Sequence, residues 1–207
     1  MEDALRLLAA TLLGYLAGSF PSAGVVSRIA TRGRVNLRRD GSGNPGGLNA
    51  MKTIGTAWGV VVIVADMAKG VVAGVVGMIV AGGPGGYAAA TAAMAGHIFP
   101  VWSRFRGGKG VATSAGGCLA VFPAFFPIDA AAAAVGVLRT RHPERTVWGN
   151  AVVWNASALA WWLADLPNLW GPAPTWGLVA FSAIGSAMVL WKFRVTAGQP
   201  KPVAVPA

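Results

Sequence analysis

The stretch AWGVVVIVADMAKGVVAGVVGMIVA, at residues 57–81, determines the class of fold. Its only charged side chains are Asp66 and Lys69, and nearly all the rest are apolar or glycine. A bilayer core about 30 Å thick needs roughly 20 such residues in one helix, so this stretch is long enough to cross a membrane. The whole chain of 207 residues agrees, because 55% of it is hydrophobic and only 12% is charged, whereas about 25% is charged in soluble domains.

The basic residues lie in four clusters between apolar runs, which accounts for a net charge of +10 in so apolar a chain. These clusters occupy residues 28–52, 104–109, 139–145 and 192–201. Lys and Arg accumulate in this way in the cytoplasmic loops of membrane proteins. The charge is therefore a signal of membrane topology, and we do not expect nucleic acid as a partner.

Apolar length and chain breaks predict five separate helices and one ambiguous region. The five are expected at about 5–29, 57–81, 87–102, 147–164 and 175–191. If residues 110–138 formed one span, the basic cluster that follows would lie on the opposite side from the other three. Pro123, Pro127 and Asp129 supply a break, so we expect two short spans that turn at the outer surface.

The sequence thus predicts an all-α integral membrane protein with about seven transmembrane helices, its N-terminus outside and its C-terminus cytoplasmic. All of the 17 Lys and Arg residues except Arg6 and Lys69 then fall on the inner side. Residues 1–195 would form a single polytopic domain in the cell (cytoplasmic) membrane. Residues 196–207, rich in proline and small residues, are expected to have no fixed structure. The single cysteine, Cys118, excludes an internal disulfide.

A glycine-rich loop precedes the apolar stretch at 57–81, with the sequence GSGNPGGLN at residues 41–49. Glycine lets successive backbone N–H groups turn toward an anion. Ser42, Asn44 and Asn49 add hydroxyl and amide donors, and Lys52 adds a positive charge. The loop is a candidate phosphate site, and a flexible connector is the alternative.

A second glycine-rich segment, at residues 107–110, leads into an apolar run. Free N–H groups at a helix start, together with Lys109 and Thr113, favour a phosphate. The segment is not a Walker loop, which needs a soluble α/β context and a different spacing. His97, ten residues upstream, is either a proton-transfer group or a packing residue at a helix end.

Asp66 and Lys69 are charged residues inside a predicted span. A spacing of three residues places them on one helix face, where pairing lowers the cost of holding either charge at membrane depth. We expect a structural intramembrane pair, with a functional role as the alternative.

Four motifs in order together resemble the bacterial acyl-phosphate-dependent glycerol-3-phosphate acyltransferases. The resemblance covers about residues 14–116, and beyond them it is only topological. The motifs are Gly18-Ser19-Phe20-Pro21; Gly41-Ser42-Gly43-Asn44 with Asn49 and Gly55; Asp66-x-x-Lys69-Gly70; and Gly96-His97-x-Phe99-Pro100 leading to Gly107-Gly108-Lys109-Gly110-Val111-Ala112-Thr113.

The resemblance implies transfer of a fatty acyl group from acyl phosphate to the 1-hydroxyl of glycerol 3-phosphate, giving lysophosphatidic acid and phosphate. It implies catalytic roles for Lys109, His97 and Ser42, with no cofactor and no metal. We expect a monomer that meets its substrates at the bilayer. The residues expected to contact substrate phosphate are Ser42, Gly43, Asn44, Asn49, Lys52, Gly107, Gly108, Lys109, Gly110 and Thr113.

Three departures from the family pattern concern the acceptor. Lys52 stands where the family has Arg, and residues 47–49 read Gly-Leu-Asn in place of Ala-Thr-Asn. Residues 191–199 lack the His, Asn and Glu of the family's C-terminal motif. His142 and Glu144, in another inner loop, are candidate replacements. These departures predict weak use of glycerol 3-phosphate or a different phosphorylated acceptor.

Two alternatives remain open from sequence: a catalytically altered relative, and a small membrane transporter or phosphate-binding protein. Coenzyme A-dependent acyltransferases with a His-x4-Asp motif are disfavoured, because Trp102 follows His97 at that spacing and Val147 follows His142.

Overall fold

The computed structural model describes residues 1–140 and 142–197, and every regular element in that part of the chain is a helix. This confirms the all-α prediction. The elements in chain order are α1 (Glu2–Ser19), α2 (Ser22–Thr31), α3 (Gly47–Ile54), α4 (Thr56–Ile98), the short 3-10 helix η1 (Val101–Ser103), α5 (Val111–Val121), α6 (Phe126–Thr140), α7 (Pro143–Leu163) and α8 (Trp176–Ala197).

Three stretches among the described residues are long and apolar enough to cross a membrane: Glu2–Thr31, Thr56–Ser103 and Trp176–Ala197. The second contains a reversal, because Ala81 and Gly82 leave helical geometry and Gly82 adopts φ +62°. A Cβ on Gly77 would lie 2.3 Å from the carbonyl oxygen of Gly85, so the two arms of α4 pack back to back. The predicted break between spans at 57–81 and 87–102 is confirmed.

The single helix predicted at about 5–29 is wrong, because α1 and α2 are separate helices divided at Phe20 and Pro21. Proline has no N–H to donate, and it keeps the preceding residue out of helical geometry. Phe20 accordingly adopts φ −54° and ψ 128°. The break frees the carbonyl of Phe20, which accepts a hydrogen bond from Lys69 Nζ at 3.2 Å.

Residues 110–138 form two helices, α5 and α6, as predicted. Phe122 and Phe125 in the turn between them stack with their ring centroids 5.2 Å apart and are fully buried. They join an aromatic cluster with Trp154 of α7 and Phe181 of α8. The turn is therefore held by the core that binds α5 to α7 and α8.

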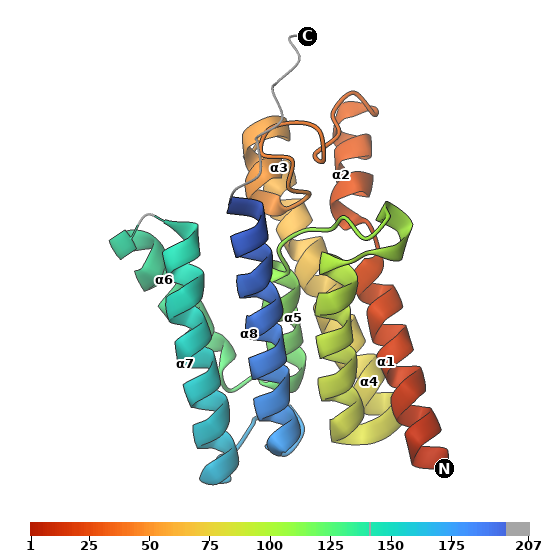
Figure 1. The fold of residues 1–207 in the computed structure, drawn as a ribbon, viewed down its shortest axis with the longest axis vertical. Helices are drawn as coiled ribbons and strands as arrows, with labels where there is room; N and C mark the ends of the chain where they lie inside the picture. The colour runs from red at the N-terminus through yellow and green to blue at the C-terminus, as the bar shows by residue number, and fades with distance from the viewer. Residues whose placement is uncertain (141, 198–207) are drawn as a thin grey trace.

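Figure 1 shows the loops that carry the basic clusters gathered at one end of the bundle. These are the loop from α2 to α3, the segment after α4, the turn between α6 and α7, and the end of α8. The N-terminus lies at the opposite end. The described parts of the four clusters thus lie at one end of the bundle, as predicted, whereas Arg141 and Lys201 lie outside the described residues.

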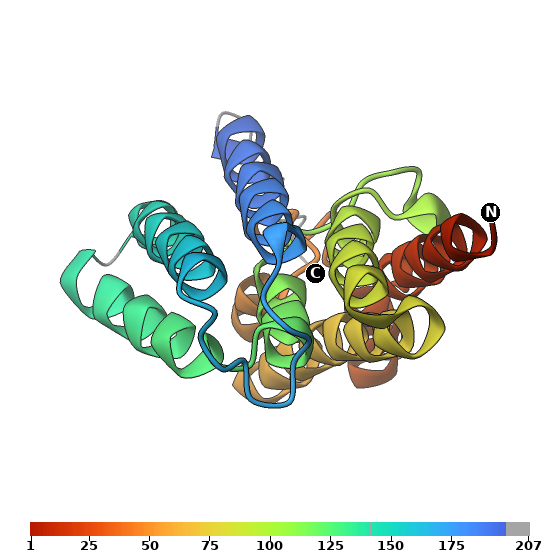
Figure 2. The ribbon, with the colours of Figure 1, turned by 90° about the horizontal axis from the view of Figure 1, so that it is seen from below.

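Glycine and alanine bring α1 and the second arm of α4 into backbone contact. A Cβ on Gly18 would lie 2.0 Å from the carbonyl oxygen of Ala93, and one on Gly96 would lie 2.2 Å from that of Tyr15. Small residues serve this purpose in membrane helices, where close packing rather than the hydrophobic effect drives association. Figure 2 shows α1 at one edge of the bundle and the pair α6 and α7 at the other.

Helix α8 continues through Thr196 and Ala197, which the sequence had assigned to the tail. The rest of that tail, residues 198–207, lies outside the described residues.

Candidate active site

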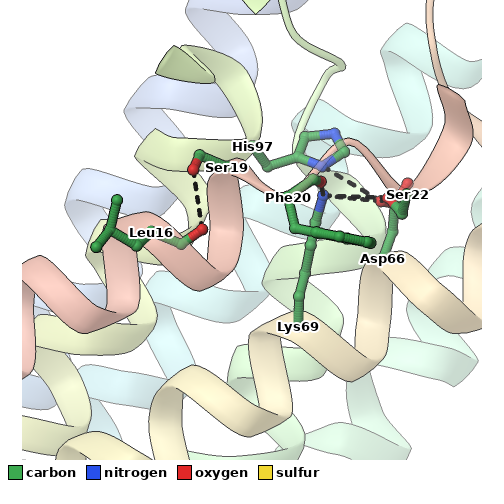
Figure 3. Close-up of polar contacts among 7 residues, drawn as sticks. All are labelled: Leu16, Ser19, Phe20, Ser22, Asp66, Lys69 and His97. Carbon is green, nitrogen blue, oxygen red and sulfur yellow. Dashed lines mark hydrogen bonds and ion pairs between the residues drawn. The ribbon is translucent and has the colours of Figure 1, made fainter. Parts of the chain in front are cut away.

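Four buried polar side chains meet where α1 breaks into α2 beside both arms of α4 (Figure 3). Lys69 Nζ lies 2.9 Å from Asp66 Oδ1, so the predicted ion pair is present. Two further residues join it. Ser22 Oγ donates a hydrogen bond to the same carboxylate oxygen, and His97 Nδ1 lies 3.5 Å from it. The carboxylate is thus shared by a hydroxyl, an ammonium group and an imidazole.

The break at Pro21 and the reversal at Gly82 together assemble this cluster. The break turns Ser22 toward the first arm of α4, and the reversal returns the chain so that His97, at the end of the second arm, faces Asp66 on the first. Isolated charges are costly at membrane depth, and mutual pairing reduces that cost. The cluster is therefore a centre of mutually paired polar groups between α1, α2 and the two arms of α4.

The loop at 107–110 is fastened directly to His97. Gly108 N–H donates to the carbonyl oxygen of His97 at 3.2 Å, and Gly107 N–H donates to that of Ile98 at 3.1 Å. A Cβ on Gly108 would lie 2.3 Å from His97 Nε2. Glycine is therefore needed here so that the imidazole can lie against the loop.

The N–H groups of Gly107 and Gly108 are therefore already donated within the protein, although both residues line the cleft described below, and their contact with phosphate stays a prediction. Gly110, at φ +87°, is the N-cap residue directly before helix α5. The N–H groups of the first turn of a helix have no partner within it. They, with Lys109, are the donors that this segment still offers to a phosphate.

Lys109 lies over the ring of Phe193 in α8, with Nζ 3.9 Å from the ring centroid. Such cation–π contact holds a partly desolvated ammonium group in place. Burial lowers the pKa of Lys109, and the negative charge of Glu144 opposes this effect. Glu144, proposed above as a replacement for the missing motif, thus acts on Lys109, whereas neither it nor His142 lines the cleft described below.

The loop at 41–49 is held together by hydrogen bonds of Asn49. Asn49 is buried, and its amide Nδ2 donates to the carbonyl oxygens of Leu37 and Asp40, both at 3.0 Å. Its Oδ1 accepts the N–H of Ser42 at 2.8 Å. Asn49 therefore holds the loop together, which is a structural role that its position in a phosphate-binding motif did not indicate.

Thr113 is likewise fully buried, and its Oγ1 has no hydrogen-bond partner within the described part of the chain. A Cβ on Gly70 would lie 2.3 Å from the carbonyl oxygen of Thr113. Thr113 thus lies in the interface of α4 and α5.

Ser42 and Lys52 are exposed at the end of the bundle that carries the loops. The cleft described next is lined by none of Ser42, Gly43, Asn44 and Lys52.

A cleft of about 260 Å³, solvent at its mouth included, opens beside the buried cluster. The residues that line it include His97, Lys69, Ser22, Arg38, Pro45 and the loop glycines Gly107 and Gly108. Arg38 Nε donates to the carbonyl oxygen of Arg106 at 3.1 Å, which ties the two loops together. Burial lowers the pKa of Arg38.

Sequence reasoning missed Ser22 and Arg38 as site residues. Arg38 was counted only as part of a basic cluster, and Ser22 directly follows the Gly-Ser-Phe-Pro motif. No group of three or more His, Cys, Asp or Glu residues in the described ranges is arranged to hold a metal ion. The cleft therefore offers cationic groups for an anion, and an imidazole whose Nδ1 lies 3.5 Å from a carboxylate as a candidate for proton transfer.

Comparison with known proteins places this geometry in a family. The model of the family described as glycerol-3-phosphate acyltransferase matches residues 8–199. The similarity thus extends beyond residues 14–116 and includes the segment with the altered C-terminal motif.

Individual relatives agree. The glycerol-3-phosphate acyltransferase of Rubrobacter xylanophilus is 35% identical over 187 residues, or 90% of this chain and 87% of the relative. That of Symbiobacterium thermophilum is 41% identical over 136 residues, or 66% of this chain and 67% of the relative. The crystal structure of PlsY (YgiH), an integral membrane glycerol 3-phosphate acyltransferase, in its glycerol 3-phosphate form matches with a TM-score of 0.73 and 25% identity over 92% of this chain and 90% of that one. The chain belongs to the glycerol-3-phosphate acyltransferase family.

Proposed function

We propose that this protein transfers a fatty acyl group from acyl phosphate to the 1-hydroxyl of glycerol 3-phosphate, with the cleft beside His97 as the acceptor site. The observation that carries this proposal is the meeting of His97, Lys69, Arg38 and the 107–108 loop around one cleft in a member of this family. In the reaction the hydroxyl oxygen bonds to the acyl carbon, the bond from that carbon to the phosphate oxygen breaks, and lysophosphatidic acid and phosphate are formed.

His97 is the proposed general base. Its Nε2 lies against Gly108 on the cleft side, while Nδ1 faces the carboxylate of Asp66. A carboxylate in this position orients the ring and favours the protonated imidazole that forms when the acceptor hydroxyl gives up its proton. The proton then passes to the departing phosphate. Asp66 is a positioning residue, and its pairing with Lys69 fixes where it stands.

The two phosphates are proposed to bind on the loop side of the bundle. The acceptor phosphate faces Arg38, whose planar guanidinium suits phosphate oxygens. The donor phosphate meets Lys109 and the first turn of α5, where positive charge and free N–H groups stabilise the leaving group. Pro45 lines the cleft, so its loop lies at the mouth, and Ser42 and Lys52 would reach the phosphates from there.

The membrane orientation follows from the grouped basic loops. We propose seven passes, made by α1 with α2, the two arms of α4, and α5 to α8, in the cytoplasmic membrane. The end with the basic loops faces the cytoplasm and the N-terminus lies outside, because Lys and Arg favour the cytoplasmic side. All residues of the proposed site come from one chain, so we propose that a monomer is active.

The activity is tested with purified protein in nanodiscs given palmitoyl phosphate and labelled glycerol 3-phosphate, followed by thin-layer separation of the lipids. We expect labelled lysophosphatidic acid in proportion to protein and time. Absence of product with all acyl phosphates, while the protein still binds them, would favour the catalytically altered relative. For topology, cysteine introduced at Thr140 should react only from the cytoplasmic side, and reaction from outside would refute the orientation.

A further inference from the structure

The segment after α4 has a tip, residues 101–106, that is both apolar and basic. Val101, Trp102 and Phe105 are 41%, 66% and 59% exposed. Arg104 and Arg106 lie among them and are exposed as well. Neither guanidinium forms an ion pair with another residue in the described ranges. This loop tip therefore presents three large apolar side chains and two cations to its surroundings.

The loop tip lies at the edge of the bundle, beside the C-terminal end of α1 (Figures 1 and 2). The hydroxyl of Tyr15, one turn before α1 ends at Ser19, donates to the carbonyl oxygen of Phe99 at 2.8 Å. Helix α1 has 18 residues. Its length of about 27 Å is close to the thickness of a bilayer core. The end of α1 and the loop tip beside it are therefore expected at the boundary between hydrocarbon and lipid headgroups.

The composition of the loop tip suits this boundary better than the medium on either side of it. Arginine is costly in hydrocarbon, and a group of large apolar side chains exposed to water usually marks an interaction site. Among headgroups, aromatic rings find an environment that is partly apolar, and arginine is attracted to anionic lipids. A planar guanidinium also matches the oxygens of a lipid phosphate.

The same loop holds both groups of the proposed acceptor site through its backbone. The carbonyl oxygen of Arg106 accepts the hydrogen bond from Arg38 Nε at 3.1 Å. Two residues further on, Gly108 N–H donates to the carbonyl oxygen of His97 at 3.2 Å. Neither bond uses the side chain of Arg106. The guanidinium groups of the loop tip can therefore bind another partner while the backbone holds the site.

We propose that the loop tip binds the headgroups of anionic phospholipids in the cytoplasmic leaflet, and that this contact steadies the backbone that holds Arg38 and His97. The enzyme is thereby more active at a negatively charged membrane surface. The effect on rate rests on the proposed acyl transfer, whereas the lipid contact itself needs no reaction.

The first test compares kcat in nanodiscs of phosphatidylcholine with kcat in nanodiscs that contain equal parts of phosphatidylcholine and phosphatidylglycerol. Both substrates are saturating, so repulsion of the anionic substrates by the anionic surface does not affect the comparison. One arginine near an anionic surface changes a binding equilibrium by about fivefold. We therefore expect kcat to be about fivefold higher in the anionic nanodiscs.

Replacing both Arg104 and Arg106 with Gln removes the charges and leaves the backbone bonds in place. This variant should have nearly the same kcat in the two kinds of nanodisc. The matched control replaces Arg139 and Arg145 with Gln, because these exposed cations lie in another basic turn, between α6 and α7. The control should keep the wild-type ratio.

Three outcomes would overturn the proposed effect on rate. The first is a ratio near one in the wild type, and the second is an unchanged ratio when Arg104 and Arg106 are replaced. The third is loss of the ratio in the control as well, which would assign the effect to the total charge of the protein.

A measurement of depth tests the lipid contact without acyl transfer. A bimane label on Trp102→Cys is compared with one on Arg34→Cys, and lipids that carry a nitroxide on the headgroup quench the fluorescence. Cys118 is buried and should not be labelled. Arg34 follows α2, whose 10 residues extend from near the end of α1. Because 10 residues of helix are about 15 Å long, the label at 34 should lie beyond the headgroups.

We expect strong quenching at position 102 and little at position 34. If no lipid product forms with any donor while position 102 is quenched, acyl transfer has failed and the lipid contact stands. Equal quenching at the two positions, or none at 102, would refute the lipid contact even in an active enzyme.

Discussion

Replacing Gly108 with alanine tests whether His97 acts through its fixed place against the 107–110 loop. A Cβ at this position would lie 2.3 Å from Nε2 and 3.0 Å from Cε1 of the imidazole, whereas ordinary contact begins at 3.4 Å. The ring or the loop must therefore move by about 1 Å. The ring is buried beside Asp66 and cannot swing freely, so the reacting geometry itself has to change.

A displacement of about 1 Å between reacting groups costs on the order of 100-fold in rate. We therefore expect Gly108→Ala to lower kcat by about 100-fold while KM for acyl phosphate changes little, because a misplaced base affects the chemical step rather than binding. The assay is steady-state formation of labelled lysophosphatidic acid in nanodiscs, with acyl phosphate varied and glycerol 3-phosphate saturating.

Gly149→Ala is the matched control, since a Cβ there would meet no atom within 4 Å. It should retain wild-type activity. The thermal unfolding midpoint of each variant shows whether the fold persists. If Gly108→Ala keeps kcat within about threefold of wild type, His97 is not the base in the place where the structure puts it, and the reasoning fails.

Asp66→Asn should destabilise the protein by about 3–5 kcal/mol, because it leaves the buried ammonium group of Lys69 without its counter-charge. Adding Lys69→Met should recover part of the lost unfolding midpoint, and an Asp66→Asn variant as stable as wild type would contradict the pairing. Lys109→Ala should lower kcat/KM at least tenfold, since a charged hydrogen bond contributes about 1.5–3 kcal/mol; wild-type turnover in this variant would remove Lys109 from the site. Gly18→Ala should cost about 1–3 kcal/mol of stability by overpacking against Ala93, whose carbonyl oxygen would lie 2.0 Å from the new Cβ. Unchanged thermal unfolding of Gly18→Ala would show that this helix contact adjusts freely.

The altered C-terminal segment gains a physical interpretation from the structure. Where relatives are expected to carry a polar motif, this chain places Phe193 beneath Lys109. An aromatic ring holds a cation but offers no hydrogen bond to an acceptor. The acceptor contacts proposed here come instead from Arg38 and His97, of which the motif comparison had indicated only His97.

The sequence by itself determined the class of fold and most of its helices, because both depend on local properties. Length of apolar runs, proline and glycine breaks and the grouping of Arg and Lys predicted the α5–α6 turn and the shared end of the basic loops. The local argument failed at Pro21, where a long apolar run concealed two helices. Whether a proline bends or ends a helix depends on which donor satisfies the carbonyl that the break frees. Here that donor is Lys69 Nζ, 49 residues from Phe20.

Only the tertiary structure decided which polar groups meet. The pairing of Asp66 with Lys69 was predictable from their spacing on one helix, but Ser22, 44 residues from Asp66, and His97 reach the same carboxylate through helix packing. Asn49 is an example of a residue expected to bind substrate whose amide N–H groups instead donate to carbonyl oxygens of its own loop. The sequence specifies the chemistry of each side chain. Its hydrogen-bond partner depends on which distant backbone and side-chain atoms the packed helices bring within hydrogen-bond distance.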